Sequence, residues 1–380
     1  MSFWCKRENA QSRTQSRTQS RTQSRTQSKT QSKTQSKTQS NVLAAETILP
    51  KIAVFEVTYR CPHRCAFCYC PWENAQDWPK DELSTAEVFS ALEMLRRCGV
   101  RQVTFSGGEP TQRPDLRELL LHARSLGLHV GLISNGRVLD AEWLDFLRPL
   151  HVQLSLSVPG IETFEQTTGV SGVGHVLQLF SMAKERGIKT CANVTVSRTN
   201  LPELYENIAY PLIYGADYLL LNRFMPGGRG MQHTELLLNA EELDLMLETA
   251  EKVLSRAGKK GHVGTELPYC VLRDPKKFRF LQISSRCSAA RYFCALDPGG
   301  WLKPCNHSPV RVCRFDEIPD QIPAHPYWKR FLESDYLPEM CTDCRHLSLC
   351  RGGCREAAHV FGGSLNSPDP LLADISKTRT

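Results

Sequence analysis

Residues 52–68 read IAVFEVTYRCPHRCAFC, and this stretch decides how the chain is organised. Residues 52–58 are mostly apolar and include β-branched side chains, which predicts a strand. The loop that follows carries Cys61, Cys65 and Cys68 at the spacing C-x3-C-x2-C. Three thiolates on a tight loop can bind three irons of a cubane, whereas a cluster used only for electron transfer usually has four cysteines. The fourth iron is thereby left open for a substrate or cofactor.

A zinc site is the alternative for this loop. The three cysteines together with His63 would supply four ligands. A spacing of x3 and then x2 directly after a strand is atypical for zinc, so we favour an iron–sulfur cluster.

Beyond the loop, apolar stretches typical of strands alternate with amphipathic stretches typical of helices. Including the first, we expect strands at residues 52–58, 100–105, 128–134, 151–157, 188–197 and 217–223. We expect helices at residues 84–98, 114–126, 140–147, 173–186, 201–214 and 239–256. Six strand–helix units in series predict an α/β fold with a parallel sheet, either doubly wound or a partial barrel. In both folds the functional residues lie at the carboxyl ends of the strands.

Charge and composition exclude several classes of function. The formal net charge is +7, but residues 1–40 alone carry nine Lys/Arg and one Glu, so the rest of the chain is close to neutral. We therefore expect no nucleic-acid partner. The sequence has neither an apolar run of about 18 residues nor an N-terminal signal core, which predicts a cytoplasmic protein without a membrane span. Sixteen cysteines in a reducing compartment favour metal binding over disulfides.

Four regions are expected along the chain. Residues 1–49 form a disordered low-complexity tail, because the QSRT and QSKT repeats have no apolar face to bury. Residues 50–265 form the strand–helix domain. Residues 266–365 are rich in cysteine, proline and glycine, which indicates a small domain organised by metal. Residues 366–380 are expected to be a frayed C-terminal tail.

A second motif follows the second strand, where residues 106–110 read SGGEP. Gly107 and Gly108 allow the backbone to approach a ligand closely, and Glu109 supplies a carboxylate for an ammonium group. One strand–helix unit after the cysteine loop, with Phe67 directly before the last cysteine, this pattern resembles the radical S-adenosylmethionine (SAM) superfamily. The resemblance implies a partial (β/α)6 TIM-like barrel and a [4Fe-4S] cluster whose open iron binds SAM. Reductive cleavage of SAM would yield a 5′-deoxyadenosyl radical that abstracts a hydrogen from the substrate.

The same resemblance implies which residues contact SAM. The GGE segment would grip the SAM amino group. Polar residues at later strand ends resemble the family's ribose, carboxylate and adenine contacts, namely Ser134, Asn135, Ser155, Ser157 and Asn193. Ordinary turn chemistry or strand polarity explains these five equally well. Many relatives carry an arginine before a glycine after the fourth strand, but here Thr168 precedes Gly169.

The C-terminal cysteines resemble a SPASM domain, the auxiliary-cluster module of many radical SAM enzymes. Residues 341–354 have the spacing C-x2-C-x5-C-x3-C, and Gly300-x4-Cys305 lies upstream. The resemblance implies one or two auxiliary [4Fe-4S] clusters. An outer cluster would use Cys341, Cys344 and Cys350, and an inner cluster would use Cys287, Cys305 and Cys354.

The fourth ligand of each auxiliary cluster is open in the sequence. For the inner cluster the candidates are Cys270 and Cys294, and we favour Cys270 because it follows a Pro-Tyr turn. For the outer cluster the family's final cysteine is expected near residues 369–372, where the sequence reads DPLL. His359, Cys313, another group or no ligand would then complete that site. A zinc knot remains an alternative for the whole block. For Cys5, Cys98 and Cys191 we expect no catalytic role. Cys70, two residues past the loop, is either a stray thiol, which we favour, or a residue near the site.

Relatives with this architecture mostly modify peptides or proteins, so we expect a radical SAM enzyme with such a substrate. Modification of a tetrapyrrole or another small molecule is the alternative, and a non-enzymatic iron–sulfur or zinc regulatory protein is a third. Residues 223–230, RFMPGGRG, are common to several subgroups and do not choose among them. About 50 residues precede the barrel, too few for a fused leader-binding domain, so a peptide would need a separate recognition protein or direct binding. Ferredoxin or flavodoxin is the expected electron donor.

Overall fold

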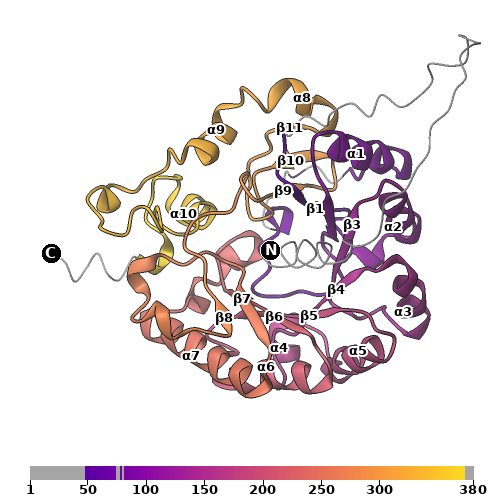
Figure 1. The fold of residues 1–380 in the computed structure, drawn as a ribbon, viewed down its shortest axis with the longest axis horizontal. Helices are drawn as coiled ribbons and strands as arrows, with labels where there is room; N and C mark the ends of the chain where they lie inside the picture. Colours follow the sequence, from indigo (N-terminus) through magenta and orange to yellow (C-terminus); the bar gives the residue numbers. More distant parts are fainter. Residues whose placement is uncertain (1–47, 74–77, 79–80, 373–380) are drawn as a thin grey trace, which may run out of the picture. The chain divides into compact units, whose positions relative to one another are not determined.

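The computed structural model describes residues 48–73, 78 and 81–372. Most of the predicted N-terminal tail, residues 1–47, lies outside the described residues, and so do residues 373–380 of the predicted C-terminal tail. Figure 1 shows the first strands on the inside of an arc of helices. The strands of this arc are β1 (Ile52–Glu56), β2 (Gln102–Ser106), β3 (His129–Ser134), β4 (Gln153–Ser157), β5 (Thr190–Val196), β6 (Tyr218–Arg223) and β7 (Lys260–Val263).

The helices that connect these strands follow the predicted amphipathic stretches. They are α1 (Thr85–Arg97), α2 (Leu116–Ser125), α3 (Ala141–Leu147), α4 (Phe164–Thr168), α5 (Val173–Glu185), α6 (Leu204–Tyr214) and α7 (Ala240–Ala257). The expected capping box opens α1: the Ser84 hydroxyl accepts a hydrogen bond from the Glu87 backbone, and the Glu87 carboxylate accepts one from Ser84. The short α4 was not predicted from the sequence.

One sheet contains all the strands, in the order β11-β10-β9-β1-β2-β3-β4-β5-β6-β7-β8. Strands β1 to β8 (β8 is Leu281–Gln282) pair in parallel, and each pairs with the next along the chain. The sheet ends at β8 and β11 instead of closing on itself, which confirms the α/β fold with a partial barrel. The six predicted strands and helices are all present, with ends that differ by at most three residues.

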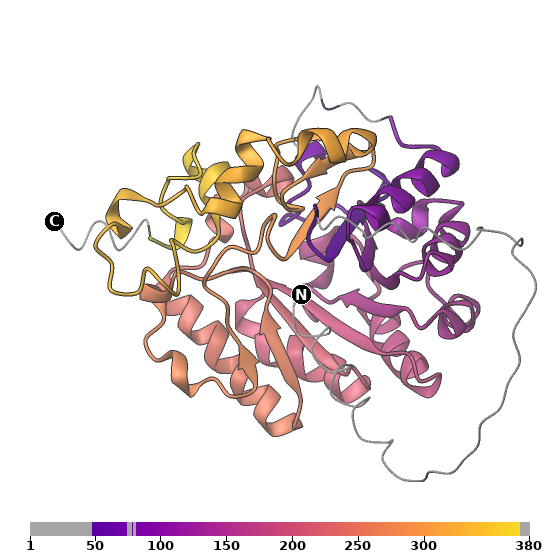
Figure 2. The ribbon, with the colours of Figure 1, turned by 45° about the horizontal axis from the view of Figure 1, so that its top comes forward.

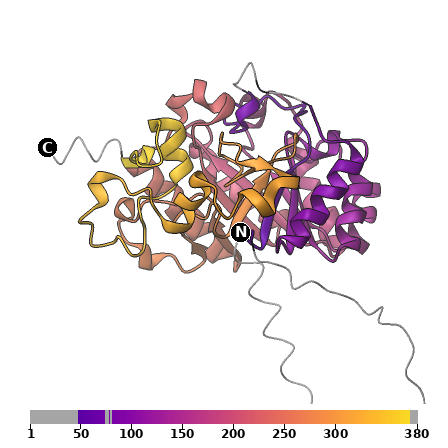
Figure 3. The ribbon, with the colours of Figure 1, turned by 90° about the horizontal axis from the view of Figure 1, so that it is seen from above.

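The cysteine-rich region continues this sheet. Strand β9 (Phe293–Leu296) pairs in parallel with β1, and β10 (Trp301–Lys303) and β11 (Cys313–Arg314) follow in antiparallel pairing. Figure 3 shows these strands beside the first strand of the arc. Short helices complete the region: α8 (Ile318–Gln321), α9 (Pro326–Glu333) and α10 (Arg355–Gly362). The described residues all belong to one compact unit, so the division expected at residue 265 stays a prediction.

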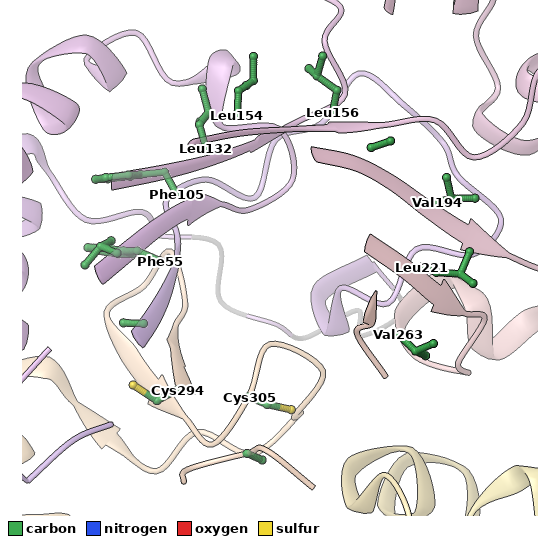
Figure 4. Packing of buried hydrophobic residues seen from close by; sticks show 14 of the residues in the cluster. Phe55, Phe105, Leu132, Leu154, Leu156, Val194, Leu221, Val263, Cys294 and Cys305 are labelled. Atoms are coloured by element: carbon green, nitrogen blue, oxygen red, sulfur yellow. The ribbon is translucent and has the colours of Figure 1, made fainter. Parts of the chain in front are cut away.

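Side chains from neighbouring strands form the core between the sheet and the helices. Figure 4 shows this layer from Phe55 on β1 to Val263 on β7. The Phe55 and Phe105 rings stack with their centroids 6.4 Å apart. Because successive residues of a strand point to opposite faces, the other face of each strand is left for the inside of the barrel.

Two buried ion pairs fasten the cysteine-rich region to the barrel. Lys303 on β10 contacts Glu56 on β1 at 2.8 Å, and Arg223 at the end of β6 contacts Asp369 at 2.7 Å. Figure 2 shows the yellow C-terminal segment beside the orange part of the cysteine-rich region. The tail was expected to begin at residue 366, but Asp369 is fully buried and residues 370–372 form a 3-10 turn. The ion pair with Arg223 is the physical reason that this part of the chain is packed.

Candidate active site and cysteine groups

The cysteine loop, residues 61–68, lies directly after β1 and is held by backbone hydrogen bonds from two directions. The Arg64 amide donates to the Thr168 carbonyl at the end of α4 over 2.8 Å. On another side, the Gly230 amide donates to the Cys68 carbonyl, and the Arg229 side chain donates to the Cys65 carbonyl, both over 3.1 Å. Segment 223–230, which was uninformative in sequence, is thus part of the loop's support. Thr168, found where relatives carry arginine, helps to support the loop from α4.

Two glycines explain how β2 meets this loop. The amides of Gly108 and Glu109 donate to the carbonyls of Thr58 and Arg60, each over 2.8 Å. A Cβ atom on Gly108 would lie 2.3 Å from the Arg60 carbonyl oxygen, and one on Gly107 would lie 2.6 Å from that of Thr58. We expected these glycines to admit a ligand. In the structure their lack of a side chain lets the backbone that leads into the cysteine loop pack closely against β2.

Glu109 joins the end of β2 to the end of β3. Its buried carboxylate accepts hydrogen bonds from the Ser134 hydroxyl at 2.8 Å and the Asn135 amide at 2.7 Å. Thr111, which the sequence did not single out, donates to it from its hydroxyl at 2.8 Å. Burial raises the pKa of Glu109, and these hydrogen bonds oppose the rise. The structure therefore brings three predicted residues together around one carboxylate.

The remaining predicted strand-end residues lie on β4 and β5. Ser157 and Asn193 are register partners, and with Ser155 they alternate with the buried residues Leu154, Leu156 and Ala192. Their side chains therefore lie on the sheet face opposite the helices. Asn193 accepts a hydrogen bond from Asn222 of β6 at 3.0 Å, a partner that no motif indicated. Phe67 is partly buried in the cysteine loop.

A polar cavity adjoins the cysteine loop. About 1150 Å³ of space free of atoms, part of it open to solvent, is lined by Tyr59, Arg60, Cys61, His63, Arg64, Glu73, Asp81, Glu82 and Arg229. Burial lowers the pKa of His63 to about 4, and the charge of Arg137 adds to the shift, so this imidazole is neutral at pH 7. The cavity thus places charged groups of both signs beside the first cysteine.

The three thiols of the loop suit a positively charged metal group. Burial raises the pKa of Cys61 to about 12, and burial together with the charges of Cys68 and Cys61 raises that of Cys65. A hydrogen bond with Cys70 lowers the pKa of Cys68, so Cys70 contacts the site, although we favoured a stray thiol. Thiols that resist ionisation become thiolates when a metal supplies the positive charge. The residues present therefore fit a cluster with three cysteine ligands.

The C-terminal cysteines fall into two groups. Cys341, Cys344 and Cys350 line one cavity together with Cys270, and we call these four the outer cysteine group. Cys270 is exposed as a residue, but the protein around its thiol raises its pKa to about 11, and the charges of Cys350, Cys341 and Cys344 add to the rise. We expected Cys270 beside Cys287, but the structure places it in the outer group. The reason is the turn after β7, where Tyr269–Val271 pack against residues 346–352.

Cys287, Cys305 and Cys354 form the inner cysteine group. The negative charges of Cys354 and Cys287 add to the effect of burial in raising the pKa of Cys305. The Cys354 amide donates to Asp369 over 3.1 Å, which ties this group to the buried ion pair with Arg223. The three cysteines predicted for the inner cluster therefore lie together.

The other proposed fourth ligands lie elsewhere. Cys294 on β9 lies against the Ile52 carbonyl, and its sulfur points away from that of Cys305 in Figure 4. Cys313 is in β11. His359 interacts with Tyr327 at 3.0 Å and with the buried Glu356 at 3.3 Å. Glu356 is also the charged neighbour with the largest effect on Cys305, a signal that the cysteine spacing could not give.

Within residues 48–73, 78 and 81–372, no three His, Cys, Asp or Glu side chains are close enough to hold a single metal ion. The cysteine groups above are therefore defined by shared cavities and by mutual electrostatic effects. In the same part of the chain, every helix is too short or too polar to cross a membrane.

Comparison with known proteins identifies relatives over most of the chain. Residues 55–208 match the sequence profile of the radical SAM superfamily. The PqqA peptide cyclase of Xanthomonas campestris pv. campestris strain 8004 is 29% identical over 339 residues, covering 86% of this chain and 87% of the relative. The PqqA peptide cyclase of Gluconobacter oxydans is also 29% identical, over 336 residues, covering 85% of this chain and 90% of the relative.

Solved structures share the fold. The crystal structure of Streptococcus suis SuiB bound to S-adenosylmethionine has a TM-score of 0.66 at 17% identity, covering 86% of this chain and 77% of that one. Native anSMEcpe with bound AdoMet and the Cp18Cys peptide also has a TM-score of 0.66, at 15% identity, covering 86% of this chain and 95% of that one. At these identities the likeness concerns the fold.

Proposed function

Because this chain belongs to the radical SAM superfamily, we propose that it modifies a peptide or protein substrate by radical chemistry. In this proposal Cys61, Cys65 and Cys68 hold a [4Fe-4S] cluster, and SAM binds at its open iron. When bound, the cluster supplies the electron that cleaves SAM, and the resulting 5′-deoxyadenosyl radical abstracts a substrate hydrogen. The curated relatives named for a peptide substrate span nearly the whole described chain, which supports this substrate class over a tetrapyrrole.

One observation carries the proposal: paired backbone hydrogen bonds fix Gly108 and Glu109 to Thr58 and Arg60, the residues that lead into the cysteine loop. The Glu109 amide and its carboxylate lie on opposite sides of this junction, since the amide bonds to Arg60 and the carboxylate to β3. Burial raises the pKa of the Glu109 carboxyl, so a cation beside it would favour its charged form. We infer that the SAM ammonium group is that cation. Ser134 and Asn135 would orient the carboxylate toward it.

The other strand-end residues complete the proposed SAM site. Ser155, Ser157 and Asn193 share the inner sheet face beyond β3, where a ribose or adenine would find hydrogen-bonding partners. Arg229 and segment 227–230 hold the loop from the side of β6 and limit its movement. Ferredoxin or flavodoxin would supply the electron, and the C-terminal cysteines would hold one or two auxiliary clusters. The proposed setting is the cytoplasm.

The test begins with SAM cleavage. The full chain, purified and reconstituted with iron and sulfide without oxygen, should release 5′-deoxyadenosine when given SAM and dithionite. Cys61→Ala, Cys65→Ala and Cys68→Ala should each abolish release, while Cys98→Ala, in a buried cysteine at the end of α1, should leave it unchanged. Wild-type protein that shows intact cluster absorbance but releases no 5′-deoxyadenosine would contradict the proposal.

The substrate class needs its own experiment. A short peptide encoded beside this protein, incubated under the same conditions, should change in mass in step with 5′-deoxyadenosine release. Deuterium from labelled peptide should appear in the 5′-deoxyadenosine, because the proposed radical takes a hydrogen from the substrate. A labelled peptide that changes in mass without such transfer would contradict hydrogen abstraction from the peptide.

A further inference from the structure

The outer cysteine group gains its fourth thiol from a distant part of the chain. Cys270 follows β7, whereas Cys341, Cys344 and Cys350 lie on the segment between α9 and α10. All four line a cavity with about 290 Å³ of space free of atoms, part of it open to solvent. A [4Fe-4S] cluster is normally held by four cysteine thiolates, one on each iron. The cavity therefore offers the number and type of ligands that such a cluster needs.

Contacts between the two segments hold Cys270 in place. The Tyr269 amide donates to the Cys350 sulfur over 3.3 Å, and the Tyr269 ring lies 4.6 Å from that of His346. A Cβ atom on Gly353 would lie only 2.8 Å from the Pro268 ring, so this ring packs closely against the Gly353 backbone. An amide that donates to a cysteine sulfur favours the charged thiolate, the form that binds iron. The turn that carries Cys270 is thus fixed to a neighbouring ligand of the same group.

Leu372 shows what Cys270 replaces. The family pattern places a final cysteine near residues 369–372, and the sequence has leucine there. Leu372 nevertheless lines the same cavity as the four cysteines. Leu372 therefore occupies the expected place of the family's cysteine with an apolar side chain, and Cys270 supplies a thiol from another segment.

We propose that Cys270, Cys341, Cys344 and Cys350 together bind one [4Fe-4S] cluster, with Cys270 in the place of the family's C-terminal cysteine. The inference rests on the proposed function for the identity of the metal group. It changes the expected ligands of both auxiliary sites. With Cys270 assigned to the outer group, the inner group has three cysteines. Two buried carboxylates act on the inner group, Glu356 on Cys305 and Glu266 on Cys287 and Cys354.

The test counts iron in full-length protein that lacks the loop cluster. The starting variant carries Cys61→Ala, Cys65→Ala and Cys68→Ala and is reconstituted with iron and sulfide without oxygen. Adding Cys270→Ala should remove about four irons per chain, or leave a three-iron cluster with its own electron paramagnetic resonance signal. Cys313→Ala, in a buried cysteine of β11, is the matched control and should remove none. Unchanged iron after Cys270→Ala would overturn the proposal.

A pair of double variants identifies the group to which Cys270 belongs. In the same background, Cys270→Ala with Cys344→Ala should lose no more iron than Cys344→Ala alone, because both disable one cluster. Cys270→Ala with Cys305→Ala should lose the iron of both groups. The opposite pattern would place Cys270 in the inner group and overturn the proposal, as would zinc in place of iron at these four cysteines. Cys270 is exposed, so the substitution should not unfold the chain, and circular dichroism checks this.

These results stand apart from the proposed reaction. Iron content is measured without SAM and without the loop cysteines, whereas 5′-deoxyadenosine release depends on the loop. Protein that binds iron at Cys270 but does not cleave SAM would support the ligand set and contradict the function. Protein that cleaves SAM but loses no iron in the Cys270→Ala variant would do the reverse.

Discussion

The cysteine loop and the outer cysteine group differ in how their thiols are brought together. The loop takes all three cysteines from one short segment, and backbone hydrogen bonds from β2, α4 and segment 227–230 shape it. The outer group joins two segments, and the hydrogen bond from the Tyr269 amide to the Cys350 sulfur links residues 81 positions apart. A site built from a local loop depends on the backbone around it, whereas a site built from two segments depends on how those segments pack.

The largest expected effect is on 5′-deoxyadenosine release. It follows from disrupting the backbone contact between Gly108 and the residues that lead into the cysteine loop. In Gly108→Val the new Cβ atom would lie 2.3 Å from the Arg60 carbonyl oxygen. Only a shift of the backbone can relieve this clash. We expect 5′-deoxyadenosine release to fall by roughly 1000-fold or more, as for loss of a ligand, because catalytic geometry tolerates little displacement. Iron in the outer group should be unchanged. Gly174→Ala is the control, since a Cβ atom there meets no other atom within 4 Å.

Removal of the charge of Glu109 should have a smaller effect, a weaker binding of SAM beside the cysteine loop. Glu109→Gln keeps the size of the side chain but removes the charge that we assign to the SAM ammonium group. A charge-assisted hydrogen bond contributes about 1.5–3 kcal/mol, so the Kd for SAM should rise by roughly 10- to 100-fold. Isothermal titration of reconstituted protein measures this. Thr111→Val, which removes a neutral donor to the same carboxylate, should change the Kd less; equal effects would contradict the assignment.

The contrast also explains what could be predicted from the sequence. The strand–helix alternation and the cysteine loop depend on neighbouring residues, and both predictions agree with the structure. The reach of Glu109 to Ser134 and Asn135 was predictable because carboxyl ends of adjacent parallel strands lie at one edge. The position of Cys270 was not, because it depends on the packing of a turn against a segment far along the chain. Strands β7, β8, β10 and β11 were missed because two to four residues are too few for a periodic pattern.

Restoring the family's missing thiol should rescue the outer cysteine group when Cys270 is absent. Leu372 lines the outer cavity together with the cysteines, so Leu372→Cys should supply a fourth thiolate there. In a variant that lacks Cys270 and the three loop cysteines, this change should return about four irons per chain. Leu371→Cys is the matched control, because Leu371 is buried next to Leu372 but does not line the cavity. Rescue by both variants, or by neither, would contradict the geometry that we describe.

The smallest effect concerns β7, the strand that leads to Cys270. Burial lowers the pKa of His262 on β7 to about 3, whereas the group titrates near 6.5 when exposed. Below pH 6.5 the unfolded chain takes up a proton that the folded chain does not, so His262 makes the protein less stable as pH falls from about 6.5 to about 3. We expect His262→Gln, compared with wild type as the metal-free protein, to lose less thermal stability between pH 7 and pH 4.5. Thermal unfolding followed by circular dichroism measures the difference, and equal losses in the two proteins would mean that β7 does not carry this sensitivity to acid.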